Sequence, residues 1–220
     1  WYSILNETER FIDKIINTPV TIQNWKDQKT VFLAKDNADI FELGFATFFL
    51  NRTNRSGILN AGPIGGFDQT GNYKIDARFN KEDLILRIKR IAHLKDKIII
   101  YNYDVKEFIN TVLMKYKNNS FIYFDPPYYV KGHELYTNFF TEEDHKIIAD
   151  SIKSLDIAWM VTYDDVPQIK SLYSDREQKL YDLNYSLSNK GKKSEVIILS
   201  NNYWPSKSDV QKLKINLRKN

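Results

Sequence analysis

An apolar strand that runs directly into two prolines is the feature that most restricts the fold of this chain. Residues 120–124 (SFIYF) predict a buried strand, and Asp125, Pro126, Pro127 and Tyr128 follow it at once. The prolines end the strand because they fix φ and remove two N–H donors. In an open α/β sheet, ligands bind where the strands end. The sequence therefore predicts a rigid turn rich in hydrogen-bond acceptors at the place where such a sheet carries its site.

Strands and helices alternate through the second half of the chain. In chain order, the expected elements are 97–101, 105–117, 120–124, 142–154, 157–162 and 164–173. Two later strands, 178–185 and 194–199, predict a closing hairpin. Such alternation predicts an α/β fold with a mostly parallel sheet, helices on both faces and an antiparallel edge.

The first half of the chain has a helical pattern without the strand–helix alternation of the second half. Apolar periodicity and capping residues predict helices at 6–17, 21–33, 38–51 and 80–93. Between the last two, residues 52–79 hold five of the eight glycines and predict an irregular segment. A loop of this length inside a compact domain is usually functional.

Composition removes several classes of chemistry. The chain has no cysteine, which excludes disulfides, thiolate zinc sites and cysteine nucleophiles. Its three histidines have no zinc-like spacing, so we expect no metal. No apolar run approaches the ~18 residues of a membrane helix, so we expect no membrane partner. The net charge of +4 is compatible with an acidic partner such as nucleic acid.

The acceptors of the turn suit a flat substrate that carries an amino group. The exocyclic amine of adenine is a poor nucleophile because its lone pair is delocalised into the ring. Acceptance of its two N–H groups by the Asp125 carboxylate and the Pro126 carbonyl would draw that lone pair out of conjugation, and Tyr128 would stack on the base. The base must first leave the duplex. The alternative is a structural turn in which Asp125 caps a helix.

Asp125 to Tyr128 resembles the Asp-Pro-Pro-Tyr catalytic motif of the Dam-like adenine-specific DNA N6-methyltransferases. Residues 49–52, followed by Ser56-Gly57, are similar to the segment that opens the target-recognition region of that family. Residues 78–80 are similar to its close, and Asp104 matches the acid that precedes the catalytic strand. The resemblance implies a Rossmann-like methyltransferase fold, S-adenosylmethionine as donor, double-stranded DNA as acceptor, a cytoplasmic enzyme and a restriction endonuclease as partner.

The family also begins with a strand and a Phe-x-Gly-x-Gly loop that holds the cofactor, and this chain has neither. We therefore expect an N-terminally incomplete fold in which Trp1 follows the missing segment, and a separate N-terminal segment or chain as a partner. Gly62, Gly65 and Gly66 follow a helix rather than a strand, so we assign them to the recognition loop.

The resemblance divides the chain into a helical part of the catalytic domain (1–37), a mostly helical and irregular target-recognition insertion (38–95), the catalytic core (96–204) and a lysine-rich tail (205–220). The implied catalytic residues are Asp125, Pro126, Pro127 and Tyr128. The implied cofactor-binding residues are Tyr103, Asp104 and Asp125. The expected DNA-binding residues are Asn51, Arg52, Arg55, Asn60, Lys74, Arg78 and Lys131.

Several alternatives remain open at this point. Asp104 either contacts the adenine of the cofactor or caps the helix that follows. His145 reads as a packing residue rather than a proton carrier. The acceptor could be RNA adenine or the N4 amine of cytosine, although an acid at position 125 favours adenine. A catalytically inactive DNA-binding remnant, or one half of a split methyltransferase, would explain the missing glycine loop.

Overall fold

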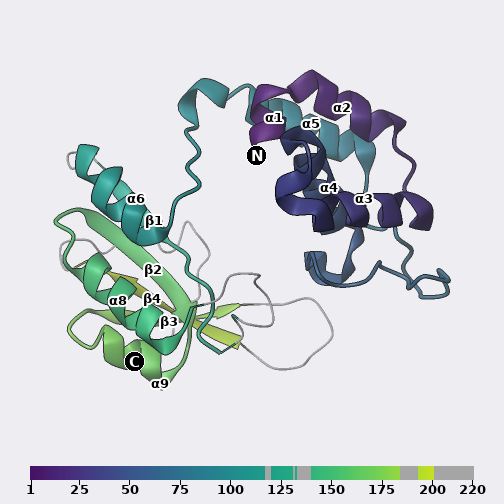
Figure 1. Ribbon diagram of the computed structural model, residues 1–220. Coiled ribbons are helices and arrows are strands. Elements are labelled where there is room, and N and C mark those ends of the chain that lie inside the picture. Colours follow the sequence, from purple (N-terminus) through teal and green to yellow (C-terminus); the bar gives the residue numbers. More distant parts are fainter. Residues whose placement is uncertain (117–119, 131, 133–139, 184–192, 201–220) are drawn as a thin grey trace. The chain divides into compact units, whose positions relative to one another are not determined.

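The computed structural model describes residues 1–220 except 117–119, 131, 133–139, 184–192 and 201–220 (Figure 1). The chain divides into two compact units, Trp1–Tyr101 and Asn102–Asn220, and each is described by itself. The lysine-rich tail predicted at 205–220 lies outside the described residues.

The first unit is helical. Its helices are α1 (Tyr2–Asn6), α2 (Thr8–Asn17), α3 (Ile22–Ala34), α4 (Ile40–Thr53) and α5 (Lys81–Ala92), with 3₁₀ turns at Lys35–Asn37, Arg55–Gly57 and Lys95–Lys97. The three later helices confirm the predictions within two residues. Thr21 caps α3 by accepting the N–H of Asn24, and Asn80 caps α5 by accepting the N–H of Asp83. The helix predicted at 6–17 is present as α2, and the short helix α1 that precedes it was not predicted.

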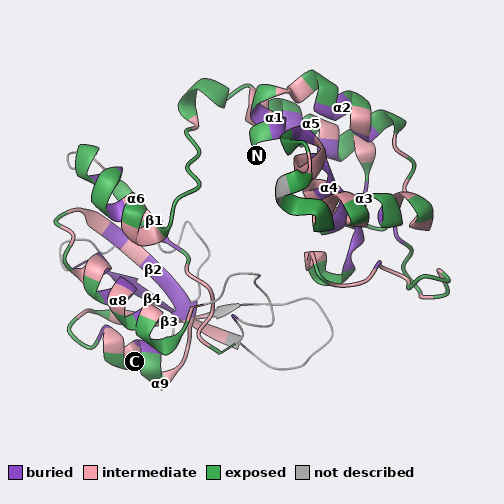
Figure 2. Cartoon of the chain, in the orientation of Figure 1, coloured by how far each residue is buried: buried purple, intermediate pink, exposed green. Residues whose placement is uncertain are grey.

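Helix α4 forms the centre of this unit. Phe41, Phe45 and Phe49 are buried along it, and the ring of Phe11 from α2 packs edge-on against the first two at 5.6–6.0 Å between centroids. Burying one such ring contributes roughly 1.5–3 kcal/mol. The helical bundle therefore has its own aromatic core (Figure 2).

Residues 52–79 are irregular, as predicted, and a buried amide organises their start. Asn54 accepts the indole N–H of Trp25 at 2.6 Å and donates from Nδ2 to the carbonyls of Ile58 and Leu59. Asn54 also forms an isolated antiparallel bridge with Pro63 in place of a hairpin. The loop is thus anchored to α3 at one buried side chain.

The second unit holds the sheet. Its strands are β1 (Phe121–Phe124), β2 (Ala158–Asp164), β3 (Gln178–Leu183) and β4 (Lys193–Leu199), and its helices are α6 (Val105–Thr111), α8 (Glu142–Lys153) and α9 (Pro167–Leu172), with a 3₁₀ turn at Leu113–Lys115. The order is β1-β2-β4-β3. The β1–β2 pair is parallel, and β4 is antiparallel to both of its neighbours. The predicted terminal hairpin is present as the β3–β4 pair. The described sheet is not mostly parallel as expected, because only one of its three pairs is parallel.

One face of this sheet forms the core. Trp159, Val161 and Tyr163 alternate along β2 and pack with apolar residues of α6, α8 and α9. The described helices of this unit therefore lie on one side of the sheet (Figure 1). On the other side, Phe121 and Tyr123 of β1 are about half exposed. Among the described residues of the second unit, helices cover one face of the sheet rather than the predicted two.

The strand predicted at 97–101 is absent from the described structure. Lys95–Lys97 form a 3₁₀ turn, and residues 98–104 are neither helix nor strand. Ile99 is 68% exposed and Ile100 is 48% exposed. An apolar run becomes a strand only when another strand accepts its backbone hydrogen bonds, and no described strand pairs with this segment.

The helix predicted at 105–117 is shorter than expected. Helix α6 ends at Thr111 and a 3₁₀ turn follows, so Tyr116 is 46% exposed rather than inward. Asn110, Thr111 and Val112 have weaker helix propensity than Lys106 and Glu107 at the start of α6, which favours an end here.

Candidate active site and nucleic-acid interface

The Asp-Pro-Pro-Tyr turn follows β1 directly. Phe124 is buried at the end of the strand, Asp125 is exposed, and Pro126 to Tyr128 are partly buried. Since β1 and β2 are parallel, the turn lies at the edge of the sheet where β2 also ends. The sequence predicted this position.

A chain of hydroxyl groups reaches the Asp125 carboxylate from the sheet. The Thr162 hydroxyl donates to Asp125 Oδ1 at 3.3 Å, and Thr162 Oγ1 lies 2.7 Å from the Tyr123 hydroxyl. Because Thr162 has a single hydroxyl hydrogen, Tyr123 is the donor to Thr162 when Thr162 donates to Asp125. Burial raises the pKa of Tyr123, so the phenol keeps its proton. No lysine or arginine of the described residues pairs with Asp125.

The ring of Tyr128 is held at its hydroxyl. Tyr128 donates to Glu195 Oε1 at 2.6 Å, and Tyr181 of β3 donates to Glu195 Oε2. Burial raises the pKa of Tyr181, and its bond to Glu195 raises it further. Glu195 thus accepts two phenolic protons on one carboxylate.

The backbone that follows the turn is bonded to the end of β2. The N–H groups of Tyr129 and Val130 donate to Asp164 Oδ1 at 2.8 Å and to Oδ2 at 3.0 Å. Asp164 and Glu195 face each other in the β2–β4 register. Sequence reasoning missed both acids; the one available signal was that Glu195 is a lone charge in the apolar stretch 194–199.

His145 is buried beneath the residue that follows the turn. Its ring lies 5.1 Å from that of Tyr129, and Nδ1 lies 2.9 Å from the Tyr163 hydroxyl. Nε2 has no partner among the described residues. Burial lowers the pKa of His145, although Asp164 and Asp144 raise it. This enclosure supports the packing role expected from the sequence.

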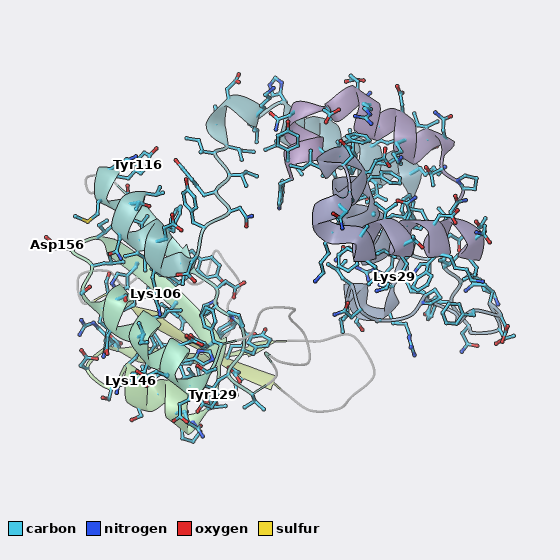
Figure 3. All side chains as sticks on the ribbon, viewed as in Figure 1. Lys29, Lys106, Tyr116, Tyr129, Lys146 and Asp156 are labelled. Atoms are coloured by element: carbon cyan, nitrogen blue, oxygen red, sulfur yellow. The ribbon has the colours of Figure 1, made fainter. Side chains whose placement is uncertain are left out.

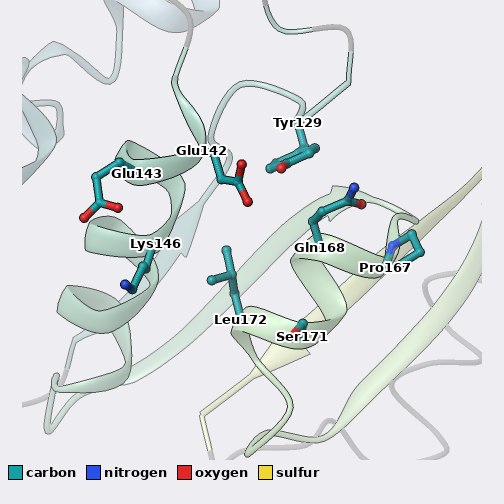
Figure 4. Close-up of a pocket in the computed structure, with 8 residues that line it drawn as sticks. All are labelled: Tyr129, Glu142, Glu143, Lys146, Pro167, Gln168, Ser171 and Leu172. Carbon is teal, nitrogen blue, oxygen red and sulfur yellow. The ribbon is translucent and has the colours of Figure 1, made fainter.

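A cavity of ≈ 560 Å³ opens beside Tyr129, between α8 and α9 (Figure 4). It is lined by Tyr129, Glu142, Glu143, Lys146, Pro167, Gln168, Ser171 and Leu172. Figure 4 shows Glu142 and Gln168 close to the Tyr129 ring. Two carboxylates against one ammonium make this lining acidic, which disfavours the phosphate backbone of DNA there.

The three residues expected to bind the cofactor differ in exposure and in the hydrogen bonds that they already make. Asp104 caps α6 by accepting the N–H of Lys106 at 2.8 Å, so the capping alternative is the one present. Tyr103 is 52% exposed immediately before it. Asp125, the third of these residues, is exposed as described above.

Three of the predicted DNA-binding residues are engaged in the loop itself. Asn51 donates from Nδ2 to the Gly57 carbonyl at 3.1 Å. Arg52 donates from Nε and Nη2 to the Arg78 carbonyl at 2.9 and 2.7 Å. Lys74 donates to the Gln69 carbonyl at 2.6 Å.

Arg52 is therefore an internal support for the ends of the loop. Partial burial lowers its pKa, and the nearby Arg78 and Arg87 lower it further. The three guanidinium groups create a local excess of positive charge. Among the described residues, only one of the three has an ion pair: Arg87 pairs with Asp83 at 2.9 Å.

The other predicted DNA-binding residues present polar groups to solvent. Arg55 and Asn60 are exposed, and Arg78 is partly exposed. Gly57 has φ +74°, and a Cβ placed there would lie 3.2 Å from Asn51 Nδ2 and 3.4 Å from Arg78 Nη1. The loop thus brings Asn51, Arg52 and Arg78 together around a glycine. Lys131 lies outside the described residues.

Neither a membrane-spanning helix nor a metal-binding cluster is present among the described residues. None of their helices has the length and apolar character to cross a membrane. Among the same residues, no group of three or more His, Cys, Asp or Glu side chains is arranged to hold a metal ion.

Comparison with known proteins agrees with the resemblance carried by the motifs. A search of curated proteins finds no match to this chain. The model of the D12 class N6 adenine-specific DNA methyltransferases matches residues 2–189, a span that contains the Asp-Pro-Pro-Tyr turn and the glycine-rich loop. The chain belongs to the D12 class N6 adenine-specific DNA methyltransferase family.

Proposed function

We propose that this protein transfers a methyl group from S-adenosylmethionine to the N6 amine of an adenine turned out of duplex DNA, on a Rossmann-like fold in the cytoplasm. One observation carries the proposal beyond family membership. Asp125 is an exposed carboxylate at the carboxyl end of β1, next to the Pro126 carbonyl, and no cation of the described residues neutralises it. A ligand with two N–H donors satisfies both acceptors.

The chemistry of the turn follows from these two acceptors. The amine donates one N–H to Asp125 and one to the Pro126 carbonyl, so its lone pair leaves conjugation with the ring. Bound S-adenosylmethionine supplies a methyl group on a positively charged sulfur. The N6–CH₃ bond forms as the carbon–sulfur bond breaks, and one N6 proton is released to water. Asp125 stabilises the positive charge that develops on N6 as it attacks.

Tyr128 holds the base. Its ring is partly buried and bonded at the hydroxyl, and an aromatic ring is the kind of surface on which a base stacks. Stacking of a base on an aromatic ring contributes about 1–3 kcal/mol. That gain offsets part of the few kcal/mol required to extrude the base from the duplex.

The described residues that suit the donor are Tyr103 and Asp125. An exposed aromatic ring suits an adenine, and a carboxylate without a cation partner suits hydroxyl or ammonium groups. Asp104 contributes less, because one of its oxygens already accepts the N–H of Lys106.

We propose that the first unit recognises the DNA. Arg55, Asn60 and Arg78 are the described residues that would contact phosphates and base edges, and Lys131 would join them. Asn51, Arg52 and Lys74 would act by holding the loop in shape, since each donates to a loop carbonyl.

The test is methylation of duplex DNA with labelled S-adenosylmethionine, followed by mass spectrometry of the nucleosides. We expect N6-methyladenine, and we expect Asp125→Ala to lower kcat by about 10²–10³-fold. The matched control is Asp156→Ala. Asp156 is an exposed acid before the amino end of β2, well away from Tyr129 in Figure 3. It should keep full activity.

Any result other than N6-methyladenine in duplex DNA would indicate a different function. N4-methylcytosine, or methylation of RNA in place of duplex DNA, would transfer the proposal to a different acceptor. Binding of duplex DNA without methylation of any base, at saturating donor, would replace it with a non-catalytic DNA-binding module.

A further inference from the structure

Two acids, one at the end of β2 and one at the start of β4, stand in an arrangement that normally costs stability. Asp164 and Glu195 are direct partners in the antiparallel register. Like charges opposite each other on neighbouring strands repel. Each acid is instead satisfied by two hydrogen-bond donors, and three of the four donors belong to Tyr128, Tyr129 and Val130.

The turn needs support from outside because of its own sequence. Pro126 and Pro127 have no N–H groups, so the turn cannot be closed by backbone donors at these positions. Beyond the prolines, the backbone N–H groups of Tyr129 and Val130 donate to the two separate carboxylate oxygens of Asp164. The Asp164 carboxylate thereby fixes where the backbone leaves the catalytic turn.

Glu195 acts on the side chain instead. It accepts the Tyr128 hydroxyl with one oxygen and the Tyr181 hydroxyl with the other. A tyrosine held at its hydroxyl loses rotation about both side-chain torsions, so its ring keeps one orientation before a base arrives. Preorganisation of this kind lowers the cost of binding.

We propose that Asp164 and Glu195 form a carboxylate clamp that positions the catalytic turn, with Asp164 setting its backbone and Glu195 setting the Tyr128 ring. This role rests on the proposed function. Neither acid touches the substrate, so both are positioning residues. The two acids have different roles. Asp164 positions the backbone, and with it the Asp125 and Pro126 acceptors, whereas Glu195 positions the Tyr128 ring on which the base stacks.

This division predicts different kinetic effects for the two acids. Asp164→Asn places an NH₂ group against one backbone N–H and displaces the turn. We expect kcat to fall about 10²-fold, because misplacement by about 1 Å has that effect. Glu195→Gln loosens the ring, which contacts the base in the ground state and the transition state alike. We expect KM for a mixed-sequence adenine-containing duplex to rise about tenfold with kcat within about twofold.

Asp165→Asn is the matched control. Asp165 is adjacent in sequence, and its two carboxylate oxygens contact Lys170 and Ser194. It should change kcat and KM by less than about twofold. If all three variants change kcat and KM to the same extent, the acids are general supports of the sheet and the clamp is wrong.

A second measurement follows the ring without using activity. In protein labelled with fluorotyrosine, the Tyr128 ¹⁹F resonance is assigned by its absence in Tyr128→Phe. We expect Glu195→Gln to shift and broaden that resonance, and Tyr181→Phe to leave it in place, because Tyr181 bonds the other oxygen. Glu195→Leu, which removes both acceptors, should shift it further if the variant folds.

The two measurements separate failure of the clamp from failure of the proposed function. An unchanged Tyr128 resonance in Glu195→Gln overturns the clamp even when methylation is normal. A wild-type protein that methylates no base overturns the proposed function, and the ¹⁹F spectra then decide alone whether Glu195 positions Tyr128.

Discussion

At the scale of single residues, His145 carries a pH dependence that can be read from its surroundings. It is buried, and burial lowers its pKa from an ordinary value near 6.5. The unfolded chain therefore binds a proton at a pH where the folded chain does not. Stability contributed by the neutral imidazole is present above pH 6.5 and is lost as the pH falls from there toward the lowered pKa.

We expect the free energy of unfolding of the second unit to fall between pH 6.5 and pH 5, with a slope of at most about 1.4 kcal/mol per pH unit from this group. Urea unfolding at several pH values measures it. His145→Gln should flatten the curve in this window. His93→Gln, at an exposed histidine of the first unit, should leave it unchanged. A wild-type curve that is flat between pH 5 and 7 would contradict the assignment.

The sequence predicted Asp125 and Tyr128 because their neighbours in the chain identify them. It did not predict Asp164 or Glu195, because their partners are 35 and 67 residues away. A local pattern cannot report a hydrogen bond that exists only after the strands have paired.

At the scale of elements, the glycine-rich loop separates supporting arginines from exposed ones. Arg52 donates two hydrogen bonds to the Arg78 carbonyl, whereas the guanidinium of Arg55 has no hydrogen bond or ion pair to a described residue. We expect Arg52→Ala to destabilise the first unit by about 1–3 kcal/mol in thermal unfolding. Arg55→Ala should leave stability within about 0.5 kcal/mol and reduce the salt dependence of DNA binding by about one unit. Equal loss of stability in both variants would refute this distinction.

The start of α8 is a second element that can be tested separately. Thr141 and Asp144 form a capping box in which each side chain accepts a backbone N–H of the other. We expect Thr141→Ala to destabilise the second unit by about 1 kcal/mol in urea unfolding. Thr141→Ser keeps the acceptor and should retain most of that stability. If Ser and Ala cost the same, the cap contributes nothing.

Helix starts were predictable because capping side chains act within four residues of their partners. The strand expected at 97–101 was not, although its residues have high β-propensity, because a strand also requires a partner and the sequence of the segment does not encode one. The end of α6 was not predicted either. The apolar periodicity continues to Tyr116, which gave an expected helix of 105–117, but the helix ends at Thr111.

At the scale of the whole molecule, two cores imply two unfolding transitions. Phe49 belongs to the aromatic core of α4, and Ile152 belongs to the core against the sheet. We expect Phe49→Ala to lower the free energy of unfolding of the first unit and Ile152→Ala that of the second unit, by about 2–5 kcal/mol each. Each variant should lower the midpoint temperature of one calorimetric transition only. A single transition that both variants shift equally would show one cooperative unit.

The sequence indicated a change of character between its halves, from helices to strand–helix alternation. It did not indicate that every described helix of the second unit would lie on one face of the sheet. Which face a helix covers depends on where the chain crosses, and amphipathic periodicity gives only that the helix has a buried side.

The long separation between the turn and its acceptors has a consequence for biosynthesis. Tyr128 leaves the ribosome 67 residues before Glu195, which corresponds to about 3–13 s at ordinary elongation rates. Throughout that interval the nascent chain carries a complete Asp-Pro-Pro-Tyr sequence whose aromatic ring is unsecured. On the proposed function, the Tyr128 ring is therefore positioned for a base only after β4 has been made, although the first unit is complete well before that.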